Sequence, residues 1–432
     1  MRNLFFLAFF FFIQILCFCQ KQNGSAKSFY QKGKDLENRS NYKDAVYWYA
    51  KGAVNADSLC IIGLSQLLLN KRVFSDKDDF LYLKNLLDAS ENNSRNKISE
   101  FYLGWLYDNG FGVDKDSVKA FNYYKLSADK NYAGAQYNEG SDYYNGVGVK
   151  QDYAVAVYWY QKSADQGNSY GENGLGNCYY YGNGIKQNYN QAVYWFGKSA
   201  DQGNADAEDE LGDCYYKGNS VKQDYNQAVY WYQKSADQGN TDGQSDLGDC
   251  YYYGNGAKQD YNQAVYWYQK SANQGNDNGQ CSLGDCYYYG NGVRQDYNQA
   301  VYWYQKSADQ GNANAQYDLG YCYRYGKGVK QDYGQAVYWY QKSANQENGS
   351  GESELGDCYN SGYGVKQDYN LAFYWYQKSA NQGKSHAQYI VGFYYEYGYS
   401  VKKDIVQAIK WYQLAANQNN DDAKAALKRL GY

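Results

Sequence analysis

Few residues in this chain of 432 could carry out chemistry. The chain contains one histidine, His386, and no nucleophile pattern surrounds that side chain. Ser94 and Lys97 have the S-x-x-K spacing in which a lysine can activate a serine, but the two motifs that accompany this spacing in hydrolases are absent. The sequence therefore predicts no catalytic residue and no enzymatic activity.

The cysteines could bind a metal or form disulfides. A structural zinc site needs closely spaced pairs such as C-x-x-C, and none is present, so we expect no metal and no cofactor. Equivalent helices of neighbouring repeats pack at least about 8–10 Å apart, beyond the Cα separation of about 7 Å that a disulfide allows. We expect free core thiols at six cysteines spaced 36 residues apart, while the pairing of Cys60 and Cys281 stays open. The six are Cys178, Cys214, Cys250, Cys286, Cys322 and Cys358.

Aspartate and tyrosine recur with the same period and could form a binding surface. Within a repeat the tyrosine lies three residues after the aspartate position, a spacing that places both on one side of a helix. Tyrosine is favoured at interfaces because it contributes area and a hydroxyl at little entropic cost. We predict a groove for an extended peptide or a protein loop; the alternative is a solvated face copied with the repeat. The predicted residues are Asp213, Asp249, Asp285, Asp357, Tyr180, Tyr216, Tyr252 and Tyr288.

Charge makes some partners unfavourable. The chain has 42 basic and 46 acidic residues, a formal net charge of -4, and the two signs are mixed along the sequence. Such a balance gives no long-range field for phosphates or anionic lipid. We expect neither nucleic acid nor a bulk membrane surface to be a partner.

A 36-residue repeat must position all of these side chains. Its most regular residues are a tryptophan and a glycine, and a period of this length predicts small modules stacked in one dimension. The tryptophans are Trp159, Trp195, Trp231, Trp267, Trp303, Trp339, Trp375 and Trp411, and the glycines run from Gly104 to Gly392 in steps of 36.

Residues 205–240 illustrate one repeat as a pair of helices. Asn204 is suited to cap a first helix, which Gly218 would end in the left-handed conformation. Asp224 opens a second helix with a capping-box pattern. Small residues should let the two helices approach closely, and the large rings should fill the groove to the next repeat. The core positions predicted in this way are Gly212, Ala228, Trp231, Tyr232 and Ala236.

Residues 1–19 have the features of a secretory signal peptide. Arg2 precedes an apolar run from Leu4 to Phe18, and Cys17 and Cys19 lie three and one residues before Gln20. The run is shorter than the ~20 residues that span a bilayer. We expect a secreted, periplasmic or cell-envelope protein without stable membrane insertion after cleavage; an uncleaved signal anchor or a lipid on Cys17 or Cys19 is the alternative.

The string from Leu247 to Gly256, continued by Asp260, Trp267 and Ala272, resembles the Sel1-like repeat, a relative of the tetratricopeptide repeat. The resemblance covers residues 97–420 in nine repeats. It implies an all-α, right-handed superhelical solenoid of helix pairs, with the first helices on the concave face, used as an adaptor. Residues 20–96 are then an N-terminal helical cap of degenerate repeats, and residues 421–432 are a C-terminal capping helix.

The repeat has a few departures from this pattern. Tyr123 replaces the tryptophan of the first repeat, and Asp142 replaces the cysteine of the second. Glu347 replaces the glycine that follows a second helix. We expect the superhelix to be distorted near Glu347.

The resemblance favours a non-catalytic scaffold that binds a protein or an extended peptide on the concave face. A solenoid that binds cell-wall or extracellular polysaccharide is the alternative, since tyrosine rings stack on sugars and aspartates bind sugar hydroxyls. Relatives in cysteine-rich bacterial subfamilies have been linked to penicillin binding. A β-lactamase-like serine hydrolase is therefore a third, weaker hypothesis.

Overall fold

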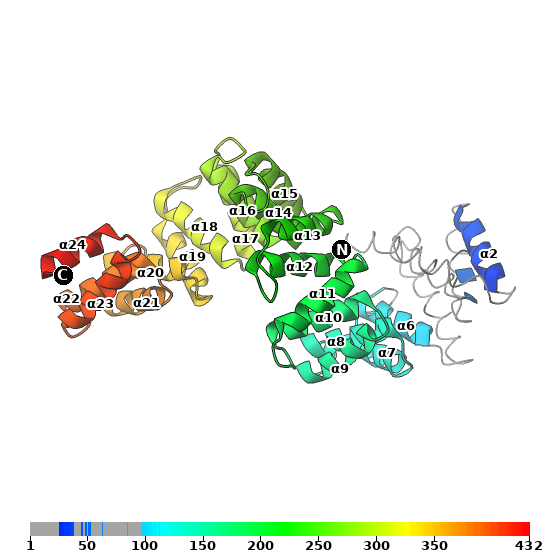
Figure 1. Cartoon of the computed structure of the whole chain (residues 1–432). Helices are drawn as coiled ribbons and strands as arrows, with labels where there is room; N and C mark the ends of the chain where they lie inside the picture. The colour runs from blue at the N-terminus through cyan, green and yellow to red at the C-terminus, as the bar shows by residue number, and fades with distance from the viewer. Residues whose placement is uncertain are drawn as a thin grey trace. The chain divides into compact units, whose positions relative to one another are not determined.

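The computed structural model describes residues 26–38, 45, 48, 49, 51, 52, 63, 84, 97–111 and 113–432. These residues form 20 α-helices and no strand (Figure 1). From α6 to α13, and again from α15 to α24, each helix packs against the next one in the chain. The protein is an all-α solenoid of helix pairs, as predicted.

The chain divides into two compact units, residues 1–243 and residues 244–432, with the boundary inside α14. Each pair consists of a first and a second helix. The first helices are α6 (Lys97–Asn109), α8 (Ala133–Asn145), α10 (Ser169–Tyr181), α12 (Ala205–Lys217), α14 (Thr241–Tyr253), α16 (Asp277–Tyr289), α18 (Ala313–Tyr325), α20 (Gly349–Ser361) and α22 (Ser385–Tyr397). The second helices are α7 (Ser117–Asp129), α9 (Tyr153–Ala164), α11 (Tyr189–Asp201), α13 (Tyr225–Asp237), α15 (Tyr261–Asn273), α17 (Tyr297–Asp309), α19 (Tyr333–Asn345), α21 (Tyr369–Asn381) and α23 (Ile405–Ala416). Before and after them lie α2 (Ala26–Asn38) and α24 (Asp421–Leu430).

Side-chain caps fix the ends of the helices. The Asn204 side chain accepts hydrogen bonds from two amides of the first turn of α12, both at 3.1 Å. Gly218 ends α12 with φ +75°, a conformation that an L side chain rarely adopts. Asp224 accepts from the amides of the first turn of α13 at 2.9 and 3.2 Å. The predicted ends of this pair are confirmed.

An aromatic ring of each second helix from α7 to α23 lies directly on the backbone of the first helix; the ring is a tyrosine except at Phe196 of α11. Tyr232 is 2% exposed, and a Cβ placed on Gly212 would lie 2.6 Å from its ring carbons. The ring of Tyr160 contacts Gly140 of its own pair in the same way, and also Gly174 of the following first helix. Glycine is therefore required by the close approach of a ring. Ala228 and Ala236 are buried in the same core.

The tryptophan packs in the opposite direction to the one predicted. Trp231 is half-buried and contacts the cluster that contains Ala192 and Phe196 of α11 and Leu211 of α12. It therefore fills the groove to the preceding second helix. The expectation that Trp231 fills the groove to the next repeat is wrong, because adjacent helical residues point about 100° apart and the neighbouring Tyr232 faces the first helices.

Buried polar contacts join the two helices of each pair. The Ser235 hydroxyl donates to the carbonyl of Ala205 at 2.8 Å, and Gln238 Nε2 donates to Glu208 Oε2 at 2.5 Å. The hydroxyl of the equivalent serine, Ser307, donates to the backbone carbonyl of Asp277 at 2.7 Å. These hydrogen bonds satisfy polar groups that helix packing removes from water. Polar side chains can therefore be buried between the two helices of a pair.

The six repeat cysteines are free thiols with no exposed surface, as predicted. Burial raises the pKa of each thiol to about 12, which keeps it protonated and unreactive. Cys281 is also free, and 8% exposed. Cys60 lies outside the described residues.

The turn at Glu347 is not distorted. Glu347 adopts φ +60°, and its amide donates to Ala344 at 3.0 Å. Gly203, at the same place in another repeat, has φ +80° and donates to Ala200 at 2.9 Å. The expected distortion is therefore absent from the turn; the glutamate keeps the left-handed geometry at a cost of about 1–2 kcal/mol.

The predicted signal peptide, residues 1–19, and Ser94 lie outside the described residues, and so does most of the predicted N-terminal cap. Within the described part, none of the helices combines the length and the apolar character that a bilayer span requires. At the other end, α24 buries Ala423 and Ala426 against Tyr412 of α23.

The contact between glycine and tyrosine can be tested with two Gly→Ala substitutions. Gly212→Ala should destabilise the fold by about 2–3 kcal/mol, because the added methyl group overlaps the Tyr232 ring. Gly197→Ala is the matched control: its Cβ would meet no atom within 4 Å, and alanine in an open helical position should stabilise by about 0.5–1 kcal/mol. Urea unfolding followed by circular dichroism measures both. Equal effects of the two changes would contradict the close-approach argument.

Candidate functional site

Acidic and basic side chains occupy different helices. The nine first helices from α6 to α22 carry 20 acidic and three basic side chains. The nine second helices from α7 to α23 carry four acidic and ten basic side chains. The mixing of signs along the sequence therefore hides a separation between the two sets of helices. We call the exposed and half-buried side chains of the first helices the first-helix face.

The predicted aspartates are half-buried and take part in the packing of each pair. The hydroxyl of Tyr232 donates to Asp213 Oδ1 at 2.7 Å. The same bond joins Tyr268 to Asp249 at 2.5 Å, Tyr304 to Asp285 at 2.6 Å, and Tyr376 to Asp357 at 2.6 Å. One carboxylate oxygen of each aspartate is thus occupied by the ring that lies on the glycine.

The predicted tyrosines are also half-buried. Tyr180 accepts from Asn219 Nδ2 at 2.9 Å and Tyr252 accepts from Asn291 Nδ2 at 2.7 Å, bonds that link one repeat to the loop of the next. Tyr216 and Tyr288 pack edge-on against Tyr225 and Tyr297, with ring centroids 5.0 and 5.1 Å apart. These tyrosines therefore stabilise the array, through contacts within a pair at Tyr216 and Tyr288 and through bonds to the next repeat at Tyr180 and Tyr252.

The most exposed phenols of the first helices lie one residue later, and the sequence reasoning missed them. They are four residues after the aspartate position, which is also a same-face spacing. An analysis that took the tyrosine four residues after the aspartate position, instead of three, would have identified them. They are Tyr181, Tyr253, Tyr289, Tyr325 and Tyr397, exposed by 56, 63, 63, 47 and 49%.

Further carboxylates belong to this face. In the first unit, burial and the neighbouring Asp213 raise the pKa of Glu210 to about 7. In the second unit, burial and the charge of Asp249 raise the pKa of Asp285 to about 6, and burial and Asp285 raise that of Asp318. Like charges held close together in a partly dehydrated surface disfavour ionisation.

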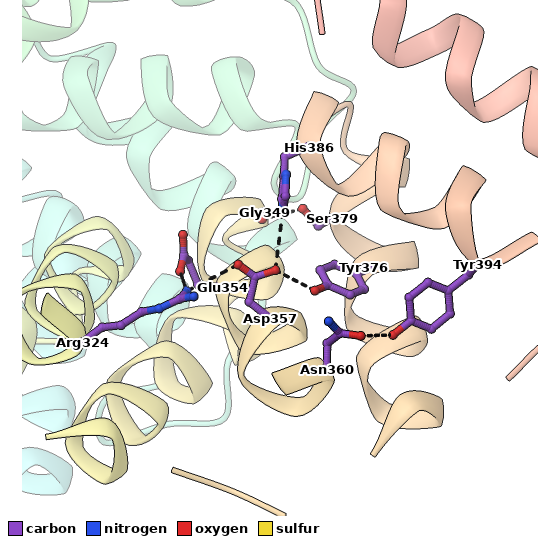
Figure 2. Close-up of polar contacts among 9 residues, drawn as sticks. All are labelled: Arg324, Gly349, Glu354, Asp357, Asn360, Tyr376, Ser379, His386 and Tyr394. Atoms are coloured by element: carbon purple, nitrogen blue, oxygen red, sulfur yellow. Dashed lines mark hydrogen bonds and ion pairs between the residues drawn. The ribbon is translucent and has the colours of Figure 1, made fainter. Parts of the chain in front are cut away.

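One part of the second unit pairs its carboxylates with cations. Figure 2 shows Asp357 between Tyr376, His386 and Arg324. Arg324 Nη1 lies 3.4 Å from Asp357 and forms a shorter ion pair with Glu354. His386 Nε2 lies 3.5 Å from Asp357 Oδ1, and this contact raises the pKa of the histidine. Although burial opposes it, these donors keep the pKa of Asp357 below its ordinary value.

Two kinds of chemical site are relevant among the described residues, a metal site and a hydrolase elbow. They contain no group of three or more His, Cys, Asp or Glu side chains placed to hold a metal ion. Residues 167–171 do form a Gly-x-Ser-x-Gly string, which in hydrolases marks a strand-to-helix elbow. Here it precedes and opens α10, where Ser169 is 4% exposed and its carbonyl accepts from Ser199.

Lowering the pH from 8 to 5 should increase the stability of the folded chain. The pKa values of Asp285 and Glu210, about 6 and 7, exceed the ordinary values of 3.8 and 4.5, so the folded state binds more protons than the unfolded state in this range. The resulting stability is complete below about pH 4 and is lost as pH rises through 6–7. Asp357 and Glu396, whose pKa values are lowered, titrate below this window.

Thermal unfolding followed by circular dichroism should therefore give a higher Tm at pH 5 than at pH 8. Asp285→Asn keeps an oxygen for Tyr304 and should remove about 1–2 kcal/mol of this pH dependence. An unchanged pH dependence in Asp285→Asn would contradict the assignment.

The Sel1 repeat model matches the chain ten times. The matched residues are 22–53, 98–132, 133–168, 169–204, 205–240, 241–276, 278–312, 313–348, 350–384 and 385–420. No curated protein matches the chain.

Solved structures of similar proteins include a protective antigen of uropathogenic Escherichia coli that displays an SLR fold. It is 32% identical, with 88% of this chain and 89% of that one covered and a TM-score of 0.43. A Sel1 repeat protein from Oxalobacter formigenes is 28% identical over 72% of this chain and 90% of that one, with a TM-score of 0.51. Cysteine rich protein B of Helicobacter pylori is 26% identical over 30% of this chain and 94% of that one, with a TM-score of 0.25. The ten matches, which together cover more than half of the chain, show that this chain belongs to the Sel1 repeat family.

Proposed function

We propose that this protein is a non-catalytic scaffold that captures an extended segment of another protein on its first-helix face. Sel1 repeat solenoids are typical of protein-interaction scaffolds, and stacked repeats create extended surfaces suited to such binding. In this proposal the first helices form the concave side, as the family resemblance implies, where a segment of polypeptide can contact several repeats at once.

The contrast between the two sets of helices carries the proposal. The sequences of α13 and α17 are identical, and α15 differs from them at Asn273 alone. The first helices from α10 to α20 keep their buried leucine, glycine and cysteine, whereas the half-buried position of Glu210 becomes Asp246, Ser282, Asp318 and Glu354 in the following repeats. Variation therefore falls on half-buried positions beside the leucine stripe, while exposed second-helix positions such as Tyr230, Tyr266 and Tyr302 stay constant. Such a pattern suits a face that recognises a non-repetitive partner.

The two faces can be compared with matched substitutions. Tyr253, Tyr289 and Tyr325 on the first helices are 63, 63 and 47% exposed, and Tyr266, Tyr302 and Tyr338 on the second helices are 50, 47 and 48% exposed. Replacing the first three by serine should weaken partner capture at least tenfold, because buried interface tyrosines contribute about 1 kcal/mol or more each. Replacing the second three should change it less than twofold.

The measurement is affinity capture with residues 20–432, followed by the Kd of the captured protein for each variant. Equal loss in both variants, or loss in the second-helix variant alone, would refute the assignment of the face. Capture of a glycan in place of a protein would favour the polysaccharide alternative.

The proposed site of action is outside the cytoplasm. Arg2, the apolar run from Leu4 to Phe18 and the small residues before Gln20 support export by residues 1–19. Expression of the full chain in an export-competent host should give a protein in the secreted or envelope fraction whose mass corresponds to a start at Gln20. A full-length mass in that fraction would indicate an uncleaved anchor, and a cytoplasmic product would refute export.

A further inference from the structure

One core position of the first helices carries a carboxylate in a single repeat. The position is leucine or valine in eight of the nine first helices and glutamate in α8. Glu139 is 0% exposed, like Leu103 and Leu175 at the same position of α6 and α10. Both of its carboxylate oxygens are buried, and neither has a hydrogen-bond partner. A group that can ionise therefore lies where the array elsewhere has a hydrocarbon side chain.

The same helix has a second exchange of this kind. Asp142, one turn after Glu139, occupies the position of Leu106 in α6 and Cys178 in α10. The residue is half-buried, and its Oδ2 is buried without a hydrogen-bond partner. Two neighbouring core positions of α8 thus hold carboxylates in place of apolar side chains.

The apolar core between α7 and α8 is correspondingly small. In α12 the residues at the two positions, Leu211 and Cys214, belong to a cluster of six buried residues that joins α12 to the preceding second helix, α11. The cluster that contains Ala128 of α7 and Ala135 of α8 has three buried members, and Trp159 is the third. Less buried apolar area therefore holds α8 to α7, and a charge buried there opposes the contact.

A lysine of α7 compensates Glu139 only in part. Lys125 Nζ lies 3.9 Å from Glu139 Oε1, and the lysine side chain is 46% exposed. Burial raises the pKa of Glu139 to about 7, although Lys125 opposes the shift, and Asp129 of α7 adds to it. Burial, Asp108 of α6 and Glu139 itself raise the pKa of Asp142 to about 8.

The remaining charged side chains of α6, α7, α9 and α10 are engaged in other contacts. They are Lys97 with the Asn131 carbonyl, Glu100 with Lys130, Lys119 with Asp116, Lys162 with the rings of Tyr158 and Trp159, and Glu172 with Lys198 and Gln202. Two phenols also interact with α8, Tyr124 with Asn138 and Tyr160 with Ser141. Among the charged groups of these four helices, Lys125 is therefore the one that offsets an ionised Glu139.

We propose that the contact between α7 and α8 is a pH-dependent joint, closed while Glu139 and Asp142 are protonated and loosened when they ionise. Ionised carboxylates draw water between the helices, because a buried and incompletely paired charge is less stable than a hydrated one. The closed joint binds more protons than the open one, in which the pKa values return to the ordinary 4.5 and 3.8. The stability of the contact is therefore complete below about pH 4 and is lost as pH rises through 7 and 8. This inference does not depend on the partner of the first-helix face.

Hydrogen exchange of the whole chain, followed by mass spectrometry, tests the joint because it reports local opening of each helix. After correction for the intrinsic effect of pH on exchange, the protection of α8 should fall at least tenfold between pH 5 and pH 8. Glu139→Gln combined with Asp142→Asn removes both ionisations and keeps the size of the side chains. In this variant the protection of α8 should be equal at the two pH values.

The matched control is Glu208→Gln, which changes an equally buried glutamate of α12. Glu208 is 0% exposed, but it accepts a hydrogen bond from Gln238 at 2.5 Å and lies 3.1 Å from Lys234 Nζ. The next first helix has glutamine at this position, Gln244, so the fold should be retained. The pH dependence of protection in α8 should change less than twofold in this control.

A second variant, Glu139→Leu combined with Asp142→Cys, restores the two residues that α10 has at Leu175 and Cys178. It should abolish the pH dependence of α8 and raise Tm at pH 8, and it decides the question if the amide variant does not fold. Equal protection of α8 at pH 5 and pH 8 in the unchanged chain, or a pH dependence that persists in the folded variants, would overturn the inference.

Discussion

The contact between an aromatic ring of the second helix, a tyrosine in all but one case, and a glycine of the first determines the geometry of each described helix pair. The ring of Tyr232 leaves no space for a Cβ at Gly212, so the two helices are as close as an aromatic ring permits. Close packing of this kind is sensitive to a single methyl group. It also directs the tyrosine hydroxyl across the first helix to Asp213, on the surface. One side chain therefore connects the interior of the repeat to the first-helix face.

This hydrogen bond explains how an aspartate of the first-helix face can stabilise the fold and still have a second carboxylate oxygen outside that bond. Asp249 and Asp285 each give one carboxylate oxygen to a buried phenol, and the second oxygen takes no part in that bond. Burial raises the pKa of both groups, which means that their ionised forms are held at some cost in folding free energy. Surfaces that retain such costs are common where a ligand offsets them.

Local chemistry explains how much of this could be predicted from the sequence. Asn204, Gly218 and Asp224 act on neighbouring residues, so the ends of the helices followed from short patterns. The direction of Trp231 did not, because it depends on which neighbouring helix its side of α13 faces. The separation of charge was hidden for a related reason: basic and acidic residues alternate along the chain, and they separate only when alternate helices face different sides. Tyr253 is more exposed than Tyr252. To predict this difference, the rotation of the first helix about its axis would have to be known to within one residue.

A nearly uniform array also makes its exceptions informative. When the repeats share one packing arrangement, a substitution in one repeat removes a known interaction. The other repeats then show which donor, acceptor or charge is missing. Tyr321 replaces the aspartate that accepts the clamping tyrosine elsewhere, and the hydroxyl of Tyr340 is left without a partner as a direct result. Tyr288 stands where the next repeat has Arg324, and Asp318 loses the guanidinium that Glu354 has. The ring of Tyr340 lies on Gly320 as its equivalents lie on their glycines, so the helix pair keeps its packing although the acceptor is missing. What the chain does not supply there must come from solvent or from a bound partner, and the neighbouring repeat shows which chemical groups fit.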